Sequence, residues 1–329
     1  MSQVRIIDVT LRDGGYRNNF EFTTDYAINA VGHLAEVGVH CAEIGYCNGS
    51  FIRKPEHGAN SAVSGDYIDA LIKAAQGRLG LCVMVHPRNV TALDLAGLAD
   101  RGIAMIRVCL RHDQFADGLQ TLALARSFGV QVSANITHVT TQSADTLSDM
   151  AKGAEDAGAD VICFADSNGH MLPEDVCRLF TRTAREVHAP LGFHAHNNLS
   201  LALANAMAAI DAGAEYIDAS LCGMGKGAGN LHLGMLIGYL HRCDHRDRHD
   251  LVKALQLSEY TAQRVASSNL PAPLTDVMLG AYNLPFDVQA RLDDIMDRLQ
   301  LASTFHGLRA LHEQSLMARP LDAMPGVRP

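Results

Sequence analysis

The chain has 329 residues, with 27 Lys and Arg against 36 Asp and Glu, and so a formal net charge of −9 with His neutral. This acidic balance argues against binding to nucleic acid or an anionic membrane, because phosphate neutralisation needs a basic surface. Hydrophobic residues make up 48% and charged residues 19%, which indicates a large buried core rather than a disordered chain.

The N-terminal segment lacks the basic region and apolar run of a signal peptide. The sequence has no run of about 18 apolar residues, so it predicts no transmembrane helix. We therefore expect a cytoplasmic protein with no membrane partner. The eight cysteines form no CxxC pair, and most lie in apolar runs such as LCVMV and IRVCL, so we expect buried, reduced thiols.

Short apolar, β-branched segments alternate with longer amphipathic segments, which is the pattern of parallel βα units. Gly ends several of the intervening helices, as in AEVG and RSFG, in keeping with its role at helix C-termini. Eight units favour a (β/α)8 TIM barrel over an open doubly wound sheet, which usually has fewer strands. The predicted strands are 4–10, 41–46, 79–85, 104–110, 130–137, 160–166, 191–196 and 216–221.

The charged run HRCDHRDRHD at 241–250 interrupts this pattern and is predicted to be a linker or solvated turn. The segment from Leu255 to Leu316 is predicted to be helical. We therefore expect an α/β fold with a catalytic barrel over residues 1–243 and a C-terminal helical extension over 244–329. An apolar stripe in the extension fits either a homodimer interface or packing on the barrel; it consists of Leu292, Ile295, Met296 and Leu299.

Polar residues gather at the ends of the predicted strands, where barrels of this kind carry their working residues. His194 and His196 are two apart on a strand, so their side chains project to the same face. With Asp13, they form a two-His, one-carboxylate set that suits Mn²⁺, Mg²⁺, Fe²⁺, Co²⁺ or Zn²⁺. For the HxH pair alone, a metal site and a hydrogen-bonded core position are equally good interpretations.

Three motifs occur in order along the chain: TLRDGG, HAHNNLSLALAN and GMGKGAGN. Together they resemble the DRE-TIM metallolyase superfamily, the HMG-CoA lyase-like group. Within it, the chain is most similar to the 4-hydroxy-2-oxovalerate aldolase family of class II pyruvate aldolases. The resemblance implies that Asp13, His194 and His196 bind a divalent metal, with Asn230 nearby or ligating through water. Mn²⁺ is the expected metal, with Mg²⁺, Co²⁺ or Zn²⁺ as alternatives.

The resemblance also implies roles in catalysis. Arg12 matches the catalytic arginine, whose guanidinium stabilises the negative charge of a pyruvate enolate. Glu43 matches an acidic residue that orients this arginine. Asp166 and Ser167 match a pair near the metal and the substrate carboxylate, although both also fit as caps of the following helix.

The chain departs from the family at two places. Aldolases of the family have a His shortly after the RDG motif as general base, whereas this chain has Tyr16. A phenol with an ordinary pKa of about 10 is a poor base at neutral pH, but it donates or relays a proton. His86, His138 and His170 are alternative bases, each better interpreted as structural. The tail does not match the region that binds an acylating aldehyde dehydrogenase, so no such partner is expected.

Other features admit two interpretations. Lys226, in the glycine-rich loop, fits either a contact to a substrate carboxylate or phosphate or a solvated loop lysine. Tyr282 fits an entry into the site from the tail, although packing is the stronger interpretation. The spacing of His241, His245 and His249 is compatible with a metal clip, but the charged run around them favours a solvated surface.

We therefore expect a metal-dependent aldolase, a carbon–carbon lyase that acts on a small-molecule 2-keto acid and an aldehyde through a pyruvate enolate. A Claisen-type acyltransferase and a 2-keto acid decarboxylase are alternatives within the superfamily. A non-catalytic barrel that binds keto acids is an alternative from another class.

Overall fold

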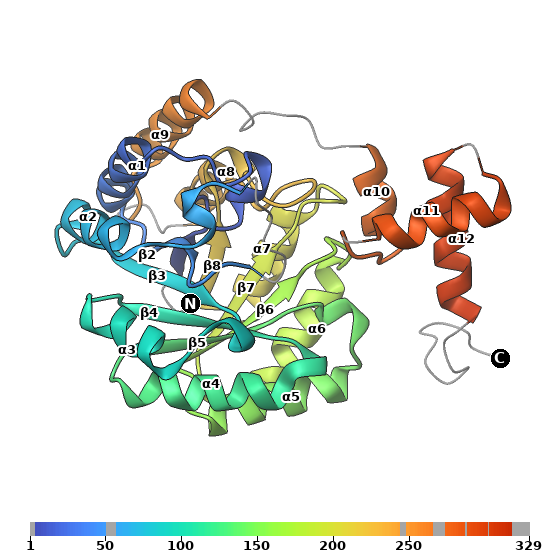
Figure 1. Cartoon of the computed structure of the whole chain (residues 1–329), viewed down its shortest axis with the longest axis horizontal. Coiled ribbons are helices and arrows are strands. Elements are labelled where there is room, and N and C mark those ends of the chain that lie inside the picture. Colours follow the sequence, from blue (N-terminus) through green and yellow to red (C-terminus); the bar gives the residue numbers. More distant parts are fainter. Residues whose placement is uncertain are drawn as a thin grey trace.

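The computed structural model describes residues 4–50, 57–243, 248–265, 274–286, 288–301 and 303–317. Its centre is a closed parallel barrel in which each strand pairs with the next and β8 pairs with β1 (Figure 1). The predicted (β/α)8 barrel is therefore confirmed. The strands are β1 (Arg5–Asp8), β2 (Cys41–Tyr46), β3 (Gly80–Val85), β4 (Met105–Leu110), β5 (Gln131–Ile136), β6 (Val161–Asp166), β7 (Leu191–Ala195) and β8 (Tyr216–Ala219).

Strands β1 and β8 each end two residues earlier than predicted, because a local hydrogen-bond network ends them together. The backbone N–H of Thr10 donates to Asp8 at 3.0 Å, and its hydroxyl donates to the same carboxylate at 2.9 Å. The hydroxyl oxygen of Thr10 also accepts from the backbone N–H of Leu221 at 2.8 Å. These bonds compete with the strand ladder and turn both chains into loops.

A ring of helices surrounds the barrel and buries an apolar face against it (Figure 1). Thr23 caps α1 through its hydroxyl, and Gly38 ends it at φ 87°, a conformation that glycine adopts without strain. The helices of this ring are α1 (Thr24–Val37), α2 (Gly65–Ala75), α3 (Ala92–Asp100), α4 (Phe115–Ser127), α5 (Ala144–Asp156), α6 (Pro173–Thr183), α7 (Ala202–Asp211) and α8 (Leu233–Arg242).

Inward side chains form two layers inside the barrel. The lower layer is apolar and consists of Ile7, Val9, Cys41, Cys82, Met105, Val161 and Tyr216. Above it lie buried polar side chains, among them Glu43, Arg107, Asn135 and Asp218. This polar layer supports the mouth of the barrel. The strand cysteines are buried free thiols, as predicted, whereas Cys177 and Cys243 are exposed.

Helix α9 (Leu251–Arg264) packs on the barrel helices α1 and α8, although it follows the predicted boundary at residue 243. The hydroxyls of Tyr26 and Thr261 lie 2.9 Å apart, and the ring of Tyr26 stacks on that of Tyr260. Figure 1 shows α9 beside α1, away from the three last helices. Part of the charged run before it, residues 244–247, lies outside the described residues.

Helices α10 (Leu274–Ala281), α11 (Gln289–Leu299) and α12 (Thr304–Met317) form a group beside the barrel with an apolar core of its own (Figure 1). Leu292 and Ile295 are buried in that core, whereas Leu299 is exposed. No helix within the described ranges is long and apolar enough to cross a bilayer.

Hydrogen bonds attach this helical group to the loops at the C-terminal ends of the strands. Asn283 accepts from the hydroxyl of Thr140 at 2.6 Å and donates to its carbonyl at 2.8 Å. Asn168 donates to Asn283 at 2.6 Å, and His170 Nδ1 lies 2.6 Å from the carbonyl oxygen of Gly280. The tail is thereby held next to the mouth of the barrel.

Candidate active site

Asp13, His194 and His196 meet at the mouth of the barrel. Asp13 follows β1, and the two His residues lie at the end of β7. Nε2 of His194 is 4.0 Å and Nε2 of His196 is 3.9 Å from Oδ2 of Asp13. All three side chains are buried, and their ligand atoms lie within 4.8 Å of one another. Among the described His, Cys, Asp and Glu residues, this is the one group of three with metal-binding geometry.

The protonation of these groups suits a cation. Burial lowers the pKa of His196 to about 3, so its imidazole is neutral at physiological pH. Burial alone would raise the pKa of Asp13, but the charges of Arg12 and the two His residues hold that pKa well below its usual range. Imidazole nitrogens together with a carboxylate oxygen are a donor set for divalent metals.

Asn230 lies beside this donor set. Its amide nitrogen donates to Oδ2 of Asp13 at 2.9 Å. Its oxygen Oδ1 is buried and has no hydrogen-bond partner among the described residues. A buried acceptor without a partner costs about 1–3 kcal/mol, which a metal ion or its water would offset. The residues present therefore fit a bound divalent metal.

His194 is oriented by a carboxylate that the sequence analysis did not identify. Nδ1 of His194 lies 2.9 Å from Oδ2 of Asp218 on β8. When Nδ1 carries the proton, the lone pair of Nε2 is available to a metal. The same arrangement occurs in other metal sites, where a ligating histidine donates its second ring N–H to a carboxylate. Asp218 accepts from Nη2 of Arg107 at 2.7 Å. Burial would raise the pKa of Asp218, but Arg107 and His194 lower it, and the carboxylate stays charged.

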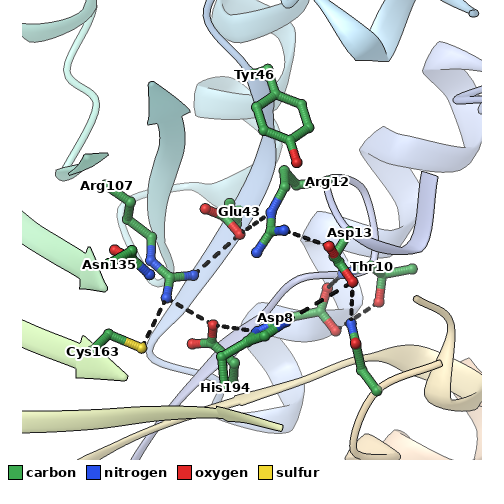
Figure 2. Close-up of polar contacts among 12 residues, drawn as sticks. Asp8, Thr10, Arg12, Asp13, Glu43, Tyr46, Arg107, Asn135, Cys163 and His194 are labelled. Carbon is green, nitrogen blue, oxygen red and sulfur yellow. Dashed lines mark hydrogen bonds and ion pairs between the residues drawn. The ribbon is translucent and has the colours of Figure 1, made fainter. Parts of the chain in front are cut away.

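Arg12 is held between two carboxylates. Its Nε donates to Glu43 and its Nη1 to Asp13, both at 2.6 Å. Glu43 in turn accepts from Nη1 of Arg107 at 3.1 Å. The resulting chain of alternating charges runs from Asp13 through Arg12, Glu43 and Arg107 to Asp218. Figure 2 shows the part from Asp13 to Arg107. A guanidinium with charged partners on two sides has little freedom to move, so it is preorganised.

Tyr16 lies beside this network, in the turn that follows Asp13. Its hydroxyl is 2.7 Å from the hydroxyl of Ser50 and 3.2 Å from that of Tyr46. Burial raises its pKa, so the phenol keeps its proton at neutral pH. The ring of His86 stacks on Tyr46 at 5.4 Å between centroids, and burial lowers the pKa of His86 to about 3.

Asp166 and Ser167 lie at the end of β6, where the sequence predicts them, and both brace loops. The carboxylate of Asp166 accepts from the backbone N–H groups of His170 and Met171, at 3.0 and 2.9 Å. Ser167 accepts from the backbone N–H of His138 at 3.0 Å. Their assignment to substrate binding stays a prediction.

Within the described part of the tail, Phe286 rather than Tyr282 reaches the site. The ring of Tyr282 stacks on His312 within the tail, at 4.5 Å between centroids. Phe286 instead contacts His196, with ring centroids 5.5 Å apart. Gly227 makes room for this contact, because a Cβ there would overlap the Phe286 ring. The possible metal clip of His241, His245 and His249 is not tested by the structure, because His245 lies outside the described residues.

The fold and this geometry define a (β/α)8 barrel with a two-His, one-carboxylate metal site and an adjacent arginine. The HMGL-like family model matches residues 105–261. Over 259 residues the chain is 33% identical to a 4-hydroxy-2-oxovalerate aldolase of Moorella thermoacetica, which covers 78% of this chain and 75% of that protein. It is 31% identical over 247 residues to an oxaloacetate decarboxylase of Mycobacterium tuberculosis, covering 75% of this chain and 72% of that one.

Solved structures share the barrel fold of this chain. The N-terminal domain of a protein designated an aldolase, from Bacteroides vulgatus, has a TM-score of 0.79 at 26% identity, over 94% of this chain and 100% of that one. The carboxyl transferase domain of Rhizobium etli pyruvate carboxylase shares the fold. Its TM-score is 0.76 at 19% identity, over 96% of this chain and 57% of that one. The chain belongs to the 4-hydroxy-2-oxovalerate aldolase family of HMGL-like, DRE-TIM proteins.

Proposed function

We propose that this protein is a divalent-metal-dependent pyruvate aldolase, a carbon–carbon lyase of the 4-hydroxy-2-oxovalerate aldolase type. The observation that carries the proposal is the single cluster in which Arg12 donates to Asp13, the carboxylate that faces His194 and His196. The relatives named 4-hydroxy-2-oxovalerate aldolase support it. The substrates are a small-molecule 2-keto acid and an aldehyde, and Mn²⁺ is the metal we propose first.

In this proposal Asp13, His194 and His196 hold the metal, and Asn230 ligates through its Oδ1 or through water. When bound, the cation supplies Lewis acidity at the keto oxygen of the substrate. Asp218 fixes the tautomer of His194, and Arg107 keeps Asp218 charged. The protein thereby maintains the donor set before substrate arrives.

Arg12 stabilises the negative charge that develops when the bond between C3 and C4 of the substrate breaks. Within the described residues, the bonds of its guanidinium involve Nε and Nη1. Its Nη2 hydrogens therefore serve the enolate oxygen. Removal of one such donor from an active site typically costs about 10²–10³ in kcat.

Tyr16 handles the proton at the oxygen on C4. Its raised pKa makes it a proton donor, which suits the addition direction, where the new alkoxide must be protonated. In cleavage the same oxygen must lose a proton, and a phenolate of raised pKa is scarce at neutral pH. We therefore propose that Tyr16 passes this proton through Ser50 or Tyr46.

A second candidate is decarboxylation of a 2-keto acid such as oxaloacetate. It is favoured by Tyr16, because a phenol of raised pKa is a poor base. Loss of carbon dioxide produces the same enolate but needs no base for a hydroxyl. The oxaloacetate decarboxylase of Mycobacterium tuberculosis among the relatives supports this candidate.

The test compares the two reactions in one preparation with Mn²⁺. Pyruvate release is followed from 4-hydroxy-2-oxovalerate and from oxaloacetate, with the metal-only rate subtracted. Release from the first substrate that Arg12→Ala abolishes supports the aldolase. Release from oxaloacetate alone favours the decarboxylase, and release from neither contradicts both.

A further inference from the structure

Helices α5 and α6 lie next to each other on the outside of the barrel (Figure 1). Between them is a cavity of about 980 Å³, and sites for small organic ligands typically measure about 300–1,000 Å³. Thr140 and His170, from the loops after β5 and β6, line one part of it. None of the metal-binding residues lines it, so the cavity is separate from the proposed active site.

Polar bridges join the two helices across this cavity. Arg182 on α6 pairs with Asp145 on α5 at 2.6 Å, and Ser148 on α5 donates to Glu186, just after α6. Long polar side chains span a distance that apolar side chains would close by direct packing. The cavity therefore keeps an apolar floor, which consists of the buried side chains of Val139, Leu147, Met171 and Leu179.

Three arginines line the cavity above this floor. Arg178 and Arg182 are engaged in ion pairs with neighbouring carboxylates. Arg185 is exposed, and its guanidinium pairs with no carboxylate in the part of the chain that the structure describes. A guanidinium binds a carboxylate through two parallel N–H···O bonds. The cavity thus combines an apolar floor with one cation that suits a single carboxylate.

We propose that this cavity is a second ligand site, which binds a monocarboxylate with an extended apolar chain. The chain lies over Leu147 and Leu179, and the carboxylate accepts hydrogen bonds from Arg185. One guanidinium compensates one carboxylate, whereas a phosphate dianion would keep a negative charge without a partner. The inference does not depend on the proposed function, because the site is separate from the metal cluster.

An exposed cysteine makes the test specific to this cavity. The thiol of Cys177 is exposed and lines the cavity, whereas Cys243 is exposed at the end of α8 and does not line it. The intact protein with Mn²⁺ is alkylated by N-ethylmaleimide with and without octanoate, and mass spectrometry follows each cysteine. We expect saturating octanoate to slow alkylation of Cys177 at least fivefold and to leave the rate at Cys243 unchanged. The buried thiols of Cys82 and Cys163 should stay unmodified, which checks that the protein remains folded.

Matched ligands and variants separate the two parts of the site. Octanamide has the chain without the charge, and acetate has the charge without the chain. Half-protection of Cys177 by octanoate should need a concentration about tenfold lower than by either, because the charge-assisted bonds and the apolar contact act together. Arg185→Gln should raise the octanoate concentration for half-protection about tenfold, whereas Arg185→Lys should keep it within threefold. Arg78→Gln is the control, because Arg78 is an exposed arginine in the turn after α2 that does not line the cavity, and it should change nothing.

Four results would overturn the inference. The first is that octanoate does not protect Cys177. The second is that octanamide protects as well as octanoate, or that Arg185→Gln changes nothing, since either removes the role of the charge. The third is stronger protection by octyl phosphate than by octanoate, which would assign a phosphate to the cavity. The fourth is protection of Cys177 that rises with protein concentration in the absence of any ligand, which would make this face an interface with a second copy of the chain.

Discussion

Replacement of Asp218 by Asn should weaken metal binding without touching a metal ligand. The change keeps the size of the side chain but removes the charge that faces Nδ1 of His194 at 2.9 Å. Asp218 is 2% exposed, so water cannot replace the lost partner. Loss of a carboxylate that supports a ligating histidine typically costs about 10–100-fold in metal affinity, equivalent to about 1.4–2.8 kcal/mol.

The same change should lower stability by a separate route. Arg107 is fully buried and would keep Glu43 but lose Asp218. Removal of one partner of a buried ion pair costs about 3–5 kcal/mol. Since Glu43 remains, we expect the lower end of this range, about 3 kcal/mol, which corresponds to roughly 4 °C in Tm for a chain of this length.

The assay is calorimetric titration of metal-free protein with Mn²⁺ at 25 °C. Circular dichroism at the same temperature checks that the variant is folded. Asp160→Asn is the matched control, because Asp160 also pairs with an arginine, Arg126, but on the surface. Its Kd for Mn²⁺ should stay within twofold of the unmodified protein. A Kd within threefold for Asp218→Asn would refute the reasoning that Asp218 orients a metal ligand.

Three further predictions concern Arg12, His86 and the tail. Arg12→Ala should lower kcat about 10²–10³-fold while Mn²⁺ affinity by calorimetry falls less than tenfold; equal losses would mean that Arg12 only positions Asp13. His86 has a pKa of about 3 in the fold, below its ordinary value, so the unfolded chain takes up the proton first and stability falls as pH drops from about 6.5 towards 3. In urea unfolding, His86→Leu should therefore lose about 2 kcal/mol less than the unmodified protein between pH 7 and pH 5, and an equal loss would contradict the assignment. Gly227→Ala should displace the ring of Phe286 from His196 and raise the KM for 4-hydroxy-2-oxovalerate several-fold, whereas an unchanged KM would mean that this ring does not contact the substrate.

The sequence predicts the barrel because each βα unit carries its own local signal. Alternating apolar segments and glycine at helix ends depend on neighbours in the chain. Asp13, His194 and His196 could be predicted for a related reason: their motifs lie at strand ends, and barrel closure brings all strand ends to one face.

The charged layer below the metal site could not be predicted in the same way. Arg107 on β4 reaches Asp218 on β8, and these strands lie on opposite sides of the closed barrel. No local pattern links two residues that are 111 positions apart. A signal was present nevertheless, because each is a charged residue within an otherwise apolar strand, which requires a buried partner.

The tail was the least predictable part. Whether Tyr282 or Phe286 reaches the site depends on how the bonds of Asn283 to Thr140 place the tail on the barrel. Both aromatic residues lie in the same short segment, AYNLPFD, so composition does not distinguish them.

The central claim is that this site forms a pyruvate enolate with a metal and Arg12. The most direct measurement is exchange of the pyruvate methyl hydrogens for deuterium in D₂O, with samples quenched by EDTA before NMR. We predict exchange with Mn²⁺, loss of exchange after prior chelation, and a rate about 10²–10³-fold lower in Arg12→Ala. Exchange that persists without metal, or at an unchanged rate in Arg12→Ala, would contradict the account.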